Sequence, residues 1–189
     1  YKGKLGAEDP EMIDTTYRVL ADHARTLAYA LADGAVPSNE GRGYVLRRVL
    51  RRALRYGKQF LDAPEGFFSR LVGGSVIECG KDFFPELEEK RDLIVEIVRE
   101  EEEAFQKLLG RGLQYFAQLS EKMESEERKI VTVEEAFYLY DTLGFPVDLT
   151  EIMAGERGYT LDMEGFQGCM EEQKERSRSA QKMAKAGGQ

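Results

Sequence analysis

Apolar residues recur at three- and four-residue steps along most of the chain, which is the period of an amphipathic α-helix. The first such stretch predicts a helix over residues 10–33, with Gly34 placed to end it. A second helix is predicted over 44–61 and a third over 66–79. Gly73 and Gly74 weaken the third helix, so close packing or a break is expected there.

A longer amphipathic stretch covers residues 87–124. Its acidic run, residues 100–103, is expected to lie on the solvated face. Strand signals are nearly absent throughout the chain. The pattern therefore predicts an all-α fold, a helical bundle with one long helix and short capped helices. We expect a larger helical region over 1–126, which includes an arginine-rich helix, and a smaller C-terminal helical subdomain over 127–189.

Short helices with polar caps are predicted in the C-terminal part. Thr132 and Glu135 have the spacing of a capping box before a helix over 133–141. Asp148 is expected to cap the helix that follows the Gly-Phe-Pro break at 144–146. A last helix is predicted to begin near residue 162.

Composition limits the class of protein. Hydrophobic residues make up 42% of the 189 residues, which is enough for a folded core. No apolar run approaches the roughly 20 residues that a membrane span needs, and no signal peptide opens the chain. We therefore expect no membrane association. The first residue is Tyr1 rather than Met, and the chain reads as a segment cut from a longer protein.

Few residues here could hold a metal ion. Cys79 and Cys169 lie far apart without a CxxC pattern, so we expect two ordinary buried or half-buried thiols rather than a zinc site or a disulfide. The single histidine, His23, falls in the middle of the first predicted helix and is expected to be packed or ion-paired. The sequence therefore predicts neither a metal site nor a catalytic residue.

Charge is distributed unevenly along the chain, whose net charge is −8. Residues 1–62 contain 11 basic and 8 acidic side chains, hence +3, whereas residues 63–189 contain 16 and 27, hence −11. Local fields, rather than the total, decide where a polyanion docks. The N-terminal part is therefore a candidate for binding one.

The second predicted helix carries most of this positive charge. At about 100° per residue, six cationic side chains of this helix fall within about 140° of one another. They are Arg47, Arg48, Arg51, Arg52, Arg55 and Lys58. Because like charges at this spacing repel, we expect partners for them. These are either phosphates, to which arginine binds with two hydrogen bonds, or the acidic residues 100–103, or a mixture of both.

The Gly41-Arg42-Gly43 segment before this helix superficially resembles a glycine-rich phosphate loop. It has no preceding strand and no GK[ST], and no further acidic or arginine motif completes an ATP site. We therefore expect no ATP site and no other cofactor in this chain.

Two long blocks of the sequence resemble alanyl-tRNA synthetases. They read ADGAVPSNEGRGYVLRR at 32–48 and LYDTLGFPVDLT at 139–150, with shorter similarities at 21–26, 84–87 and 101–105. The similarity follows the family's order over essentially the whole chain. It implies the helical middle domain that grips the tRNA acceptor stem. In this family the aminoacylation core lies before such a segment and the zinc-binding editing domain lies after it.

The resemblance also implies roles for two residues. The family reads the G·U wobble pair of the acceptor stem with an asparagine and an aspartate, which correspond to Asn39 and Asp141. The chemistry suits this role, because the guanine 2-amino group is exposed in the minor groove of A-form RNA. An aspartate accepts hydrogen bonds, and an asparagine both donates and accepts. From the residues alone, either side chain could instead cap or bond its own helix end.

The resemblance thus implies the tRNA-binding part of an alanine–tRNA ligase, whose expected partners are the tRNA(Ala) acceptor stem and the enzyme's catalytic and editing domains. In this interpretation the phosphates of the stem are bound by Arg47, Arg48, Arg51, Arg52, Arg55 and Lys58. ATP with magnesium would serve the whole enzyme, which is expected in the cytoplasm or in an organelle. The alternative is a helical protein-interaction or assembly module that contacts a partner through its acidic long helix. Salt separates the two, because only phosphate binding weakens steeply with salt concentration.

Overall fold

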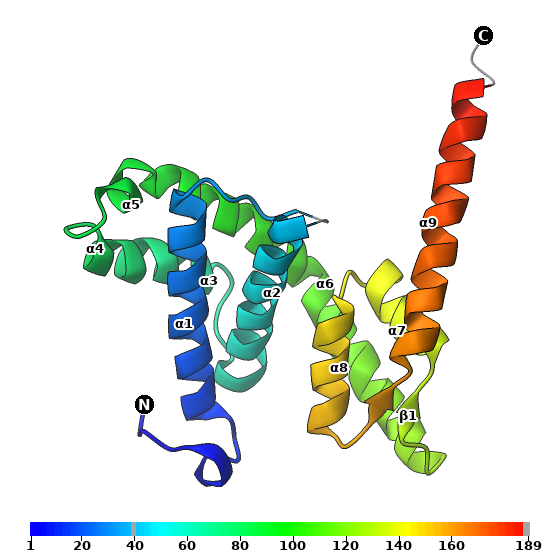
Figure 1. Cartoon of the computed structure of the whole chain (residues 1–189). Helices are drawn as coiled ribbons and strands as arrows, with labels where there is room; N and C mark the ends of the chain where they lie inside the picture. The colour runs from blue at the N-terminus through cyan, green and yellow to red at the C-terminus, as the bar shows by residue number, and fades with distance from the viewer. Residues whose placement is uncertain (39–40, 187–189) are drawn as a thin grey trace. The chain divides into compact units, whose positions relative to one another are not determined.

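The computed structural model describes residues 1–38 and 41–186, with the backbone alone for residue 174 and residues 177–186. Helices make up most of this part of the chain (Figure 1), which confirms the predicted all-α fold. The strands found among these residues form one short parallel pair, β1 (Ile130–Val131) with β2 (Thr160–Leu161). Within the described ranges, no helix is long and apolar enough to cross a membrane.

The chain divides into two compact units, Tyr1–Leu109 and Gly110–Gln189. The division falls inside the long helix α6 (Arg91–Ser125), whereas the boundary expected from the sequence follows that helix. Each unit has its own core, because fully buried aromatic side chains occur in both, among them Phe68 in the first and Phe145 in the second.

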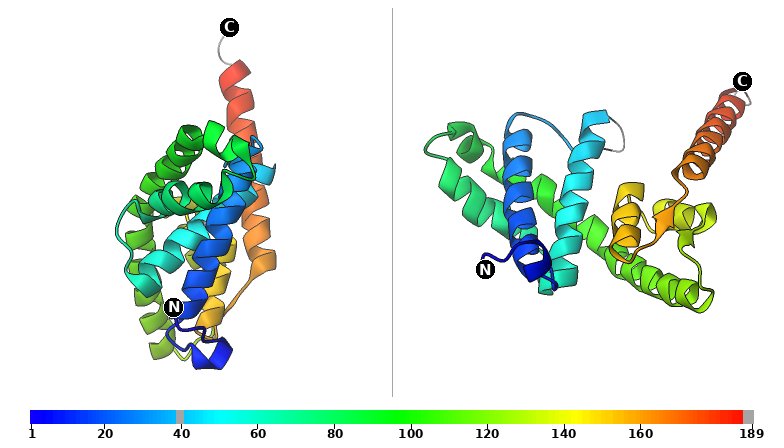
Figure 2. Two further views of the ribbon diagram at one scale, coloured as in Figure 1. Left: turned by 90° about the vertical axis from the view of Figure 1, so that its left-hand side faces the viewer. Right: turned by 60° about the horizontal axis from the view of Figure 1, so that its bottom comes forward.

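Two long helices dominate the first unit. Its helical elements are η1 (Gly6–Glu8), α1 (Ile13–Ala32), α2 (Gly41–Leu61), α3 (Phe67–Leu71), the π-helical turn η2 (Val72–Val76), α4 (Ile77–Gly80), α5 (Pro85–Glu89) and the beginning of α6. Helices α1 and α2 lie side by side (Figures 1 and 2). Leu20 and Leu27 of α1 are buried with Leu50 and Leu54 of α2, so the helical spacing of these leucines builds one core.

Helix α1 begins three residues later than predicted. Met12 adopts a left-handed backbone conformation with φ of 60°, which is incompatible with continuing the helix toward the N-terminus. The carboxylate of Asp9 accepts hydrogen bonds from the backbone N–H groups of Asp14 and Thr15, at 3.2 and 2.7 Å. Gly34 follows the last turn with φ of +89°, which confirms its predicted role in ending the helix.

The expected break at Gly73-Gly74 is present as the π-helical turn η2, which separates α3 from α4. A side chain on Gly73 would lie 2.8 Å from Cγ2 of Val95, so close packing also occurs here. The guanidinium of Arg91 donates a hydrogen bond of 2.8 Å to the carbonyl of Gly73. The two glycines therefore permit a widened turn that packs closely on α6.

The prediction that residues 100–103 form a solvated face is wrong for two of them. Glu102 is fully buried, and its carboxylate accepts hydrogen bonds from the backbone N–H groups of Phe68 and Ser69, at 3.1 and 3.0 Å. Glu101 is paired with Arg47 of α2. The first turn of α3 leaves backbone N–H groups without helical partners, and the carboxylate of Glu102 satisfies two of them from the neighbouring helix.

The long helix also begins later than predicted. Residues 85–89 form the separate helix α5, and Lys90, with φ of −108° and ψ of 13°, interrupts the helical path before α6. Pro85 occupies the first turn of α5, where its missing N–H costs no helical hydrogen bond. The ammonium of Lys90 contacts the last carbonyl of α1, that of Ala32.

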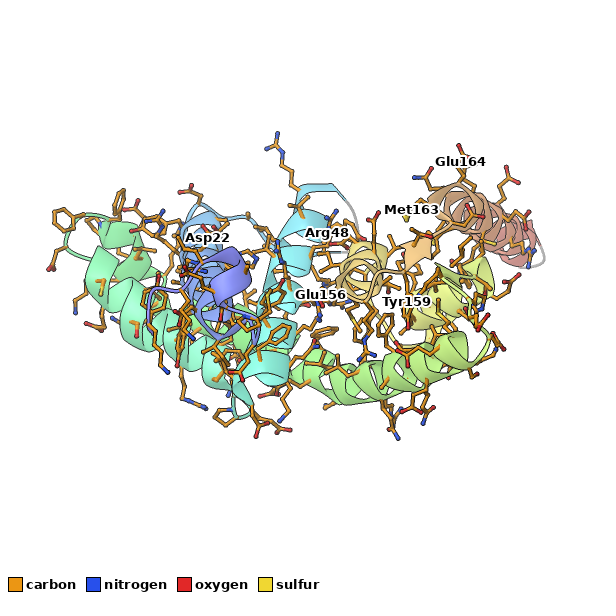
Figure 3. The ribbon with its side chains drawn as sticks, turned by 90° about the horizontal axis from the view of Figure 1, so that it is seen from below. Asp22, Arg48, Glu156, Tyr159, Met163 and Glu164 are labelled. Atoms are coloured by element: carbon orange, nitrogen blue, oxygen red, sulfur yellow. The ribbon has the colours of Figure 1, made fainter. Side chains whose placement is uncertain are left out.

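The second unit combines the end of α6 with shorter elements. They are β1, α7 (Val133–Phe137), the π-helical turn η3 (Tyr138–Thr142), α8 (Val147–Glu156), β2 and α9 (Met163–Ala186), whose first residues, Met163 and Glu164, are labelled in Figure 3. The predicted capping box is confirmed, because Thr132 and Glu135 exchange both of its hydrogen bonds. Helix α9 packs against α7.

The predicted capping role of Asp148 is wrong. Pro146 is the N-cap of α8, and no side chain makes the capping hydrogen bond. The backbone of Pro146, with φ of −57° and ψ of 139°, leads directly into the helix and places Asp148 within the first turn. An acidic residue is favourable there because of the helix dipole, but it does not cap.

The two cysteines differ in exposure. Cys169 is half-buried, as predicted, whereas Cys79 is exposed, contrary to the prediction. Cys79 lies in the short helix α4 two positions after the fully buried Ile77, a step that places its side chain on the opposite face. Both are free thiols.

Candidate nucleic-acid interface

The six cationic side chains predicted to bind phosphate all lie on α2, but the helix has neighbours on more than one side. Helix α1 packs along it, and Arg47 reaches α6. Six residues of α2 besides the arginines are buried: Leu46, Leu50, Ala53, Leu54, Tyr56 and Gly57. Because α2 is packed on more than one side, its arginine side chains differ widely in their exposure to solvent.

Arg47 is held by a carboxylate of the same unit. Its Nε donates to both carboxylate oxygens of Glu101, at 3.1 and 3.0 Å, and its Nη2 also contacts Glu101. The two side chains are 18% and 17% exposed. For Arg47, the partner is therefore the acidic run at residues 100–103, which was one of the alternatives expected for the six cations.

Three further arginines stack on aromatic rings. The guanidinium of Arg51 lies 5.1 Å from the ring centre of Phe105, and that of Arg52 lies 5.5 Å from Tyr56. Arg55 is fully buried, lies 5.4 Å from the ring of Tyr56, and donates a hydrogen bond of 2.8 Å from Nε to Gln59. A guanidinium above an aromatic face is held by cation–π attraction and packing.

Arg48 and Lys58 lie nearer the surface. Arg48, labelled in Figure 3, is half-buried with its guanidinium 5.8 Å from the ring centre of Tyr44. Lys58 is exposed and pairs at 2.7 Å with Asp62, which is also exposed. Arg42, in the first turn of α2, is exposed as well. Arg42 is not among the six cations predicted from the sequence to share one face of this helix.

Arg52 also affects His23 of α1. Burial is the largest cause that lowers the pKa of His23 below its ordinary value of 6.5, and the positive charge of Arg52 adds to it. A hydrogen bond of 3.0 Å to the neighbouring Asp22, labelled in Figure 3, acts in the opposite direction. His23 is thus packed and paired, as predicted.

The first predicted wobble reader, Asn39, lies outside the described residues. On one side of it Pro37 is buried, and on the other side α2 begins at Gly41, whose φ is +57°. A side chain at Gly43 would lie 2.3 Å from both the carbonyl of Val36 and the hydroxyl of Ser38. The second glycine of the Gly-Arg-Gly segment is therefore required by backbone packing.

The second predicted reader, Asp141, lies in η3 of the second unit above a buried apolar floor. Leu139 and Phe145 are fully buried, and Leu143 is nearly so. Asp141 itself is exposed. Buried Leu139 and Leu143 flank the exposed Asp141 and Thr142, so apolar packing holds this segment while the Asp141 carboxylate faces solvent.

The π-helical geometry of η3 departs from the continuous helix predicted over 133–141. The backbone N–H of Leu143 donates to the carbonyl of Tyr138, five residues earlier, at 3.2 Å. The N–H of Phe145 then donates to Leu139 at 2.9 Å. Gly144, between them, has φ of +66°, which glycine adopts without strain. Single π-helical turns occur frequently at functional sites.

A residue of α9 contacts Asp141. Nε2 of Gln173 donates a hydrogen bond of 2.7 Å to Oδ1 of Asp141. Gln173 is not among the site residues predicted from the sequence. Its spacing of seven residues from the apolar Phe166 is the signal that could have placed it on the inward face of α9.

The element that precedes η3 is anchored by an arginine–glutamate pair. Arg128 donates from both terminal nitrogens to Glu135, at 2.9 and 2.8 Å, and Glu135 also closes the capping box. Burial by itself raises the pKa of Glu135, but Arg128 and the N–H of Thr132 outweigh it and lower the pKa below its ordinary value of 4.5. Glu135 is therefore ionised at neutral pH.

No group of three or more histidine, cysteine, aspartate or glutamate side chains in the described part of the chain could hold a metal ion. A surface hollow of about 890 Å³ in the first unit is lined by side chains of both charges and by the backbone of η2. Neither the seven cationic residues of α2 nor Asp141 line it. The candidate residues of each unit, on α2 in the first and on η3 in the second, therefore lie outside this hollow.

Comparison with known proteins gives consistent matches. Residues 2–188 match the family described as tRNA synthetases, class II (A). An alanine–tRNA ligase from Chlorobium phaeobacteroides is 52% identical over 90% of this chain and 19% of its own length. The cytoplasmic one of Dictyostelium discoideum is 48% identical over 98% and 19%, and the mitochondrial one of Saccharomyces cerevisiae is 47% identical over 94% and 18%. The chain spans about a fifth of the length of these curated relatives.

Proposed function

Because this chain belongs to the class II tRNA synthetase family, and within it to the alanine–tRNA ligases, we propose that it is the tRNA-binding middle domain of such an enzyme. It holds the acceptor stem of tRNA(Ala) and reads the G·U wobble pair. The single observation that carries this proposal is the exposed carboxylate of Asp141 on a buried apolar floor.

The chemistry of Asp141 suits a reader of guanine. A carboxylate accepts hydrogen bonds and donates none, and the 2-amino group of guanine is a donor exposed in the shallow minor groove of A-form RNA. In a G·C pair one N–H of this group is used by cytosine, whereas a G·U wobble leaves the whole group unpaired. Asn39, which both donates and accepts hydrogen bonds, is the second residue that binds this base pair in our proposal.

The cations of α2 divide between two tasks. Arg42, Arg48 and Lys58 reach solvent at least in part and bind phosphate oxygens, which fixes the acceptor stem without reading its sequence. Arg47 and Arg55 mainly hold the unit together, through Glu101 in one case and Tyr56 with Gln59 in the other. Arg51 and Arg52 stack on rings and orient the helix.

We place the ATP-dependent attachment of alanine, and the magnesium it uses, outside this chain. A phosphate loop follows a strand and contains GK[ST], whereas the Gly41-Arg42-Gly43 segment comes after helix α1 and lacks GK[ST]. The residues of this segment therefore do not fit an ATP site. The catalytic and editing domains of the whole enzyme are the intramolecular partners.

The reading role is tested with two acceptor-stem hairpins that differ only in G·U against G·C. We expect the chain to prefer G·U, and Asp141→Ala to lose that preference, about tenfold for one hydrogen bond to a charged acceptor. Glu134→Ala is the matched control, because it removes an exposed carboxylate of the neighbouring helix α7. Equal weakening of both hairpins by Asp141→Ala would remove the reading role.

The phosphate role is tested by a salt series on the same hairpins. Binding through phosphates predicts that log K falls linearly with log[salt], by roughly 0.7 to 0.9 per phosphate contacted. Arg48→Ala should weaken binding of the G·U and G·C hairpins by the same factor, and so should Arg51→Ala. A larger loss of affinity for Arg48→Ala than for Arg51→Ala supports the assignment of Arg48 to phosphate and Arg51 to stacking. Weak salt dependence, or no binding, would instead favour a protein-interaction module.

A further inference from the structure

We propose that Gln173 is a positioning residue for Asp141, holding its carboxylate in the orientation that reads the wobble pair. The inference rests on the function proposed above. It adds a residue of α9, an element to which no reading role has been given. The contact that motivates it is the hydrogen bond of 2.7 Å from Nε2 of Gln173 to Oδ1 of Asp141.

The position of Gln173 follows from the packing of α9. Phe166, at the start of that helix, is buried against the rings of Phe137 and Tyr140, with centre-to-centre distances of 6.2 and 5.6 Å. Residues four and seven positions later lie on the same face of a helix, and these are the half-buried Met170 and Gln173. The apolar contact thus fixes the rotation of α9 and brings the amide of Gln173 to η3.

The beginning of α9 is fixed as well. The carboxylate of Asp162 accepts a hydrogen bond of 3.0 Å from the backbone N–H of Gly165. A side chain at Gly165 would lie 2.6 Å from Oδ2 of Asp162 and 2.7 Å from Cγ2 of Val133. The first turn of α9 therefore packs closely against α7. This packing fixes the position of the start of the helix that carries Gln173.

A neutral amide is suited to hold a carboxylate that must still bind a partner. A carboxylate offers about four acceptor sites on two oxygens, and Gln173 uses one of them on Oδ1. Among the described residues, no other hydrogen bond to the Asp141 carboxylate is found. A lysine or arginine in the same place would neutralise the charge, whereas glutamine leaves it intact for a guanine amino group.

Holding the side chain also reduces the entropy lost on binding. An exposed aspartate otherwise samples several rotamers, and ordering a side chain at an interface opposes association. The expected contribution to the preference for G·U over G·C is about two- to tenfold. Affinity for the G·C hairpin should hardly change, because the affected hydrogen bond, from the unpaired guanine amino group to Asp141, is specific to the wobble pair.

The test measures the ratio of affinities for the G·U and G·C hairpins in variants of the chain. Gln173→Ala should lower this ratio about two- to tenfold. Gln173→Lys, which keeps a donor at this place, should retain part of it, and Gln173→Glu, which repels Asp141, should lose it. Gln167→Ala is the matched control, because Gln167 is an exposed glutamine of the same helix. Circular dichroism confirms that each variant is folded.

The outcomes separate this inference from the function it rests on. A ratio lowered by Gln173→Ala, with Gln167→Ala unchanged, supports the positioning role. If Asp141→Ala lowers the ratio and Gln173→Ala does not, the inference is overturned and the reading role stands. A ratio raised by Gln173→Ala also overturns it, because Gln173 would then compete with RNA for the carboxylate. If the unmodified chain shows no preference, both proposals fail.

Discussion

The first unit carries seven cations on α2 and engages most of them with its own side chains, whereas the second carries the exposed carboxylate of Asp141 in η3, beside buried apolar residues. In the first, Arg47 is paired with Glu101 and Arg55 is fully buried. In the second, Asp141 makes a single hydrogen bond, to Gln173, among the described residues. The number of charges along a helix is therefore a poor measure of the charge that a partner can reach.

Each unit also contains an arginine–glutamate pair of similar exposure, and the two pairs differ in reach. Arg47 and Glu101 are separated by 54 residues and join α2 to α6. Arg128 and Glu135 are separated by 7 residues, and Glu135 closes a capping box at the same time. The same chemistry thus fastens two helices in one unit and fixes the start of one helix in the other.

The largest expected effect comes from removing the floor beneath Asp141. Phe145 is fully buried, so Phe145→Ala should lower the free energy of unfolding of the second unit by about 3–5 kcal/mol. It should also reduce the preference for G·U, because η3 loses its support. Denaturant unfolding measures the first effect, and the hairpin assay measures the second.

The control for this variant is Phe83→Ala in the first unit. Phe83 is 82% exposed, and its removal should change stability by less than about 0.5 kcal/mol. Equal destabilisation by Phe145→Ala and Phe83→Ala would contradict the conclusion that Phe145 belongs to the core and Phe83 to the surface.

The two arginine–glutamate pairs should differ when the acid is removed. Glu101→Ala leaves Arg47 without this carboxylate and should cost about 2 kcal/mol. Glu135→Ala loses the equivalent pair and one half of the capping box, about 1 kcal/mol more. Hydrogen exchange of peptides from each unit shows where the loss falls. A larger effect of Glu101→Ala would mean that the long-range contact dominates.

Two glycines of α6 give opposite expected signs. A side chain on Gly112 would lie 2.0 Å from Cε2 of Phe145, whereas nothing lies within 4 Å of one on Gly110. Gly112→Ala should therefore destabilise the second unit by about 1–3 kcal/mol. Gly110→Ala should stabilise the helix by up to about 1 kcal/mol. If thermal unfolding shows the same sign for both variants, the close contact with Phe145 is not what requires Gly112.

The smallest expected effect is a difference in acid sensitivity. The lowered pKa of His23 means that the unfolded chain takes up this proton more readily, so the first unit should lose stability as pH falls below about 6.5. The lowered pKa of Glu135 acts in the same direction but only below about 4.5. Hydrogen exchange at pH 7, 5.5 and 4 separates the two windows. His23→Asn should abolish the first window and leave the second unchanged.

Much of the fold could be predicted from local patterns. Helical periodicity located α1, α2 and the long helix, and the spacing of Thr132 and Glu135 located a capping box that is present. These signals depend on residues within a few positions of one another, which a linear sequence displays directly. The start of α1 was missed because it depends on the left-handed backbone at Met12.

The candidate site was less accessible to sequence reasoning. Whether Glu102 faces solvent depends on the N–H groups of α3, more than 30 residues away. Gln173 lies 32 residues from Asp141 in the chain and meets it through the packing of α9. The spacing from Phe166 could place Gln173 on the inward face of α9, but no local signal pairs it with Asp141. The resemblance to the family could therefore suggest Asp141 and not its hydrogen-bond partner.

Because η3 is a π-helical turn, the direction of the Asp141 side chain depends on the number of residues in that turn. Its hydrogen bond spans five residues where an α-helix spans four, so the turn contains one residue beyond the α-helical phase. Deleting a single residue there would rotate the carboxylate by about 100° relative to α7. In this segment, insertions and deletions should therefore be as damaging to the proposed reading of the wobble pair as replacing the aspartate itself.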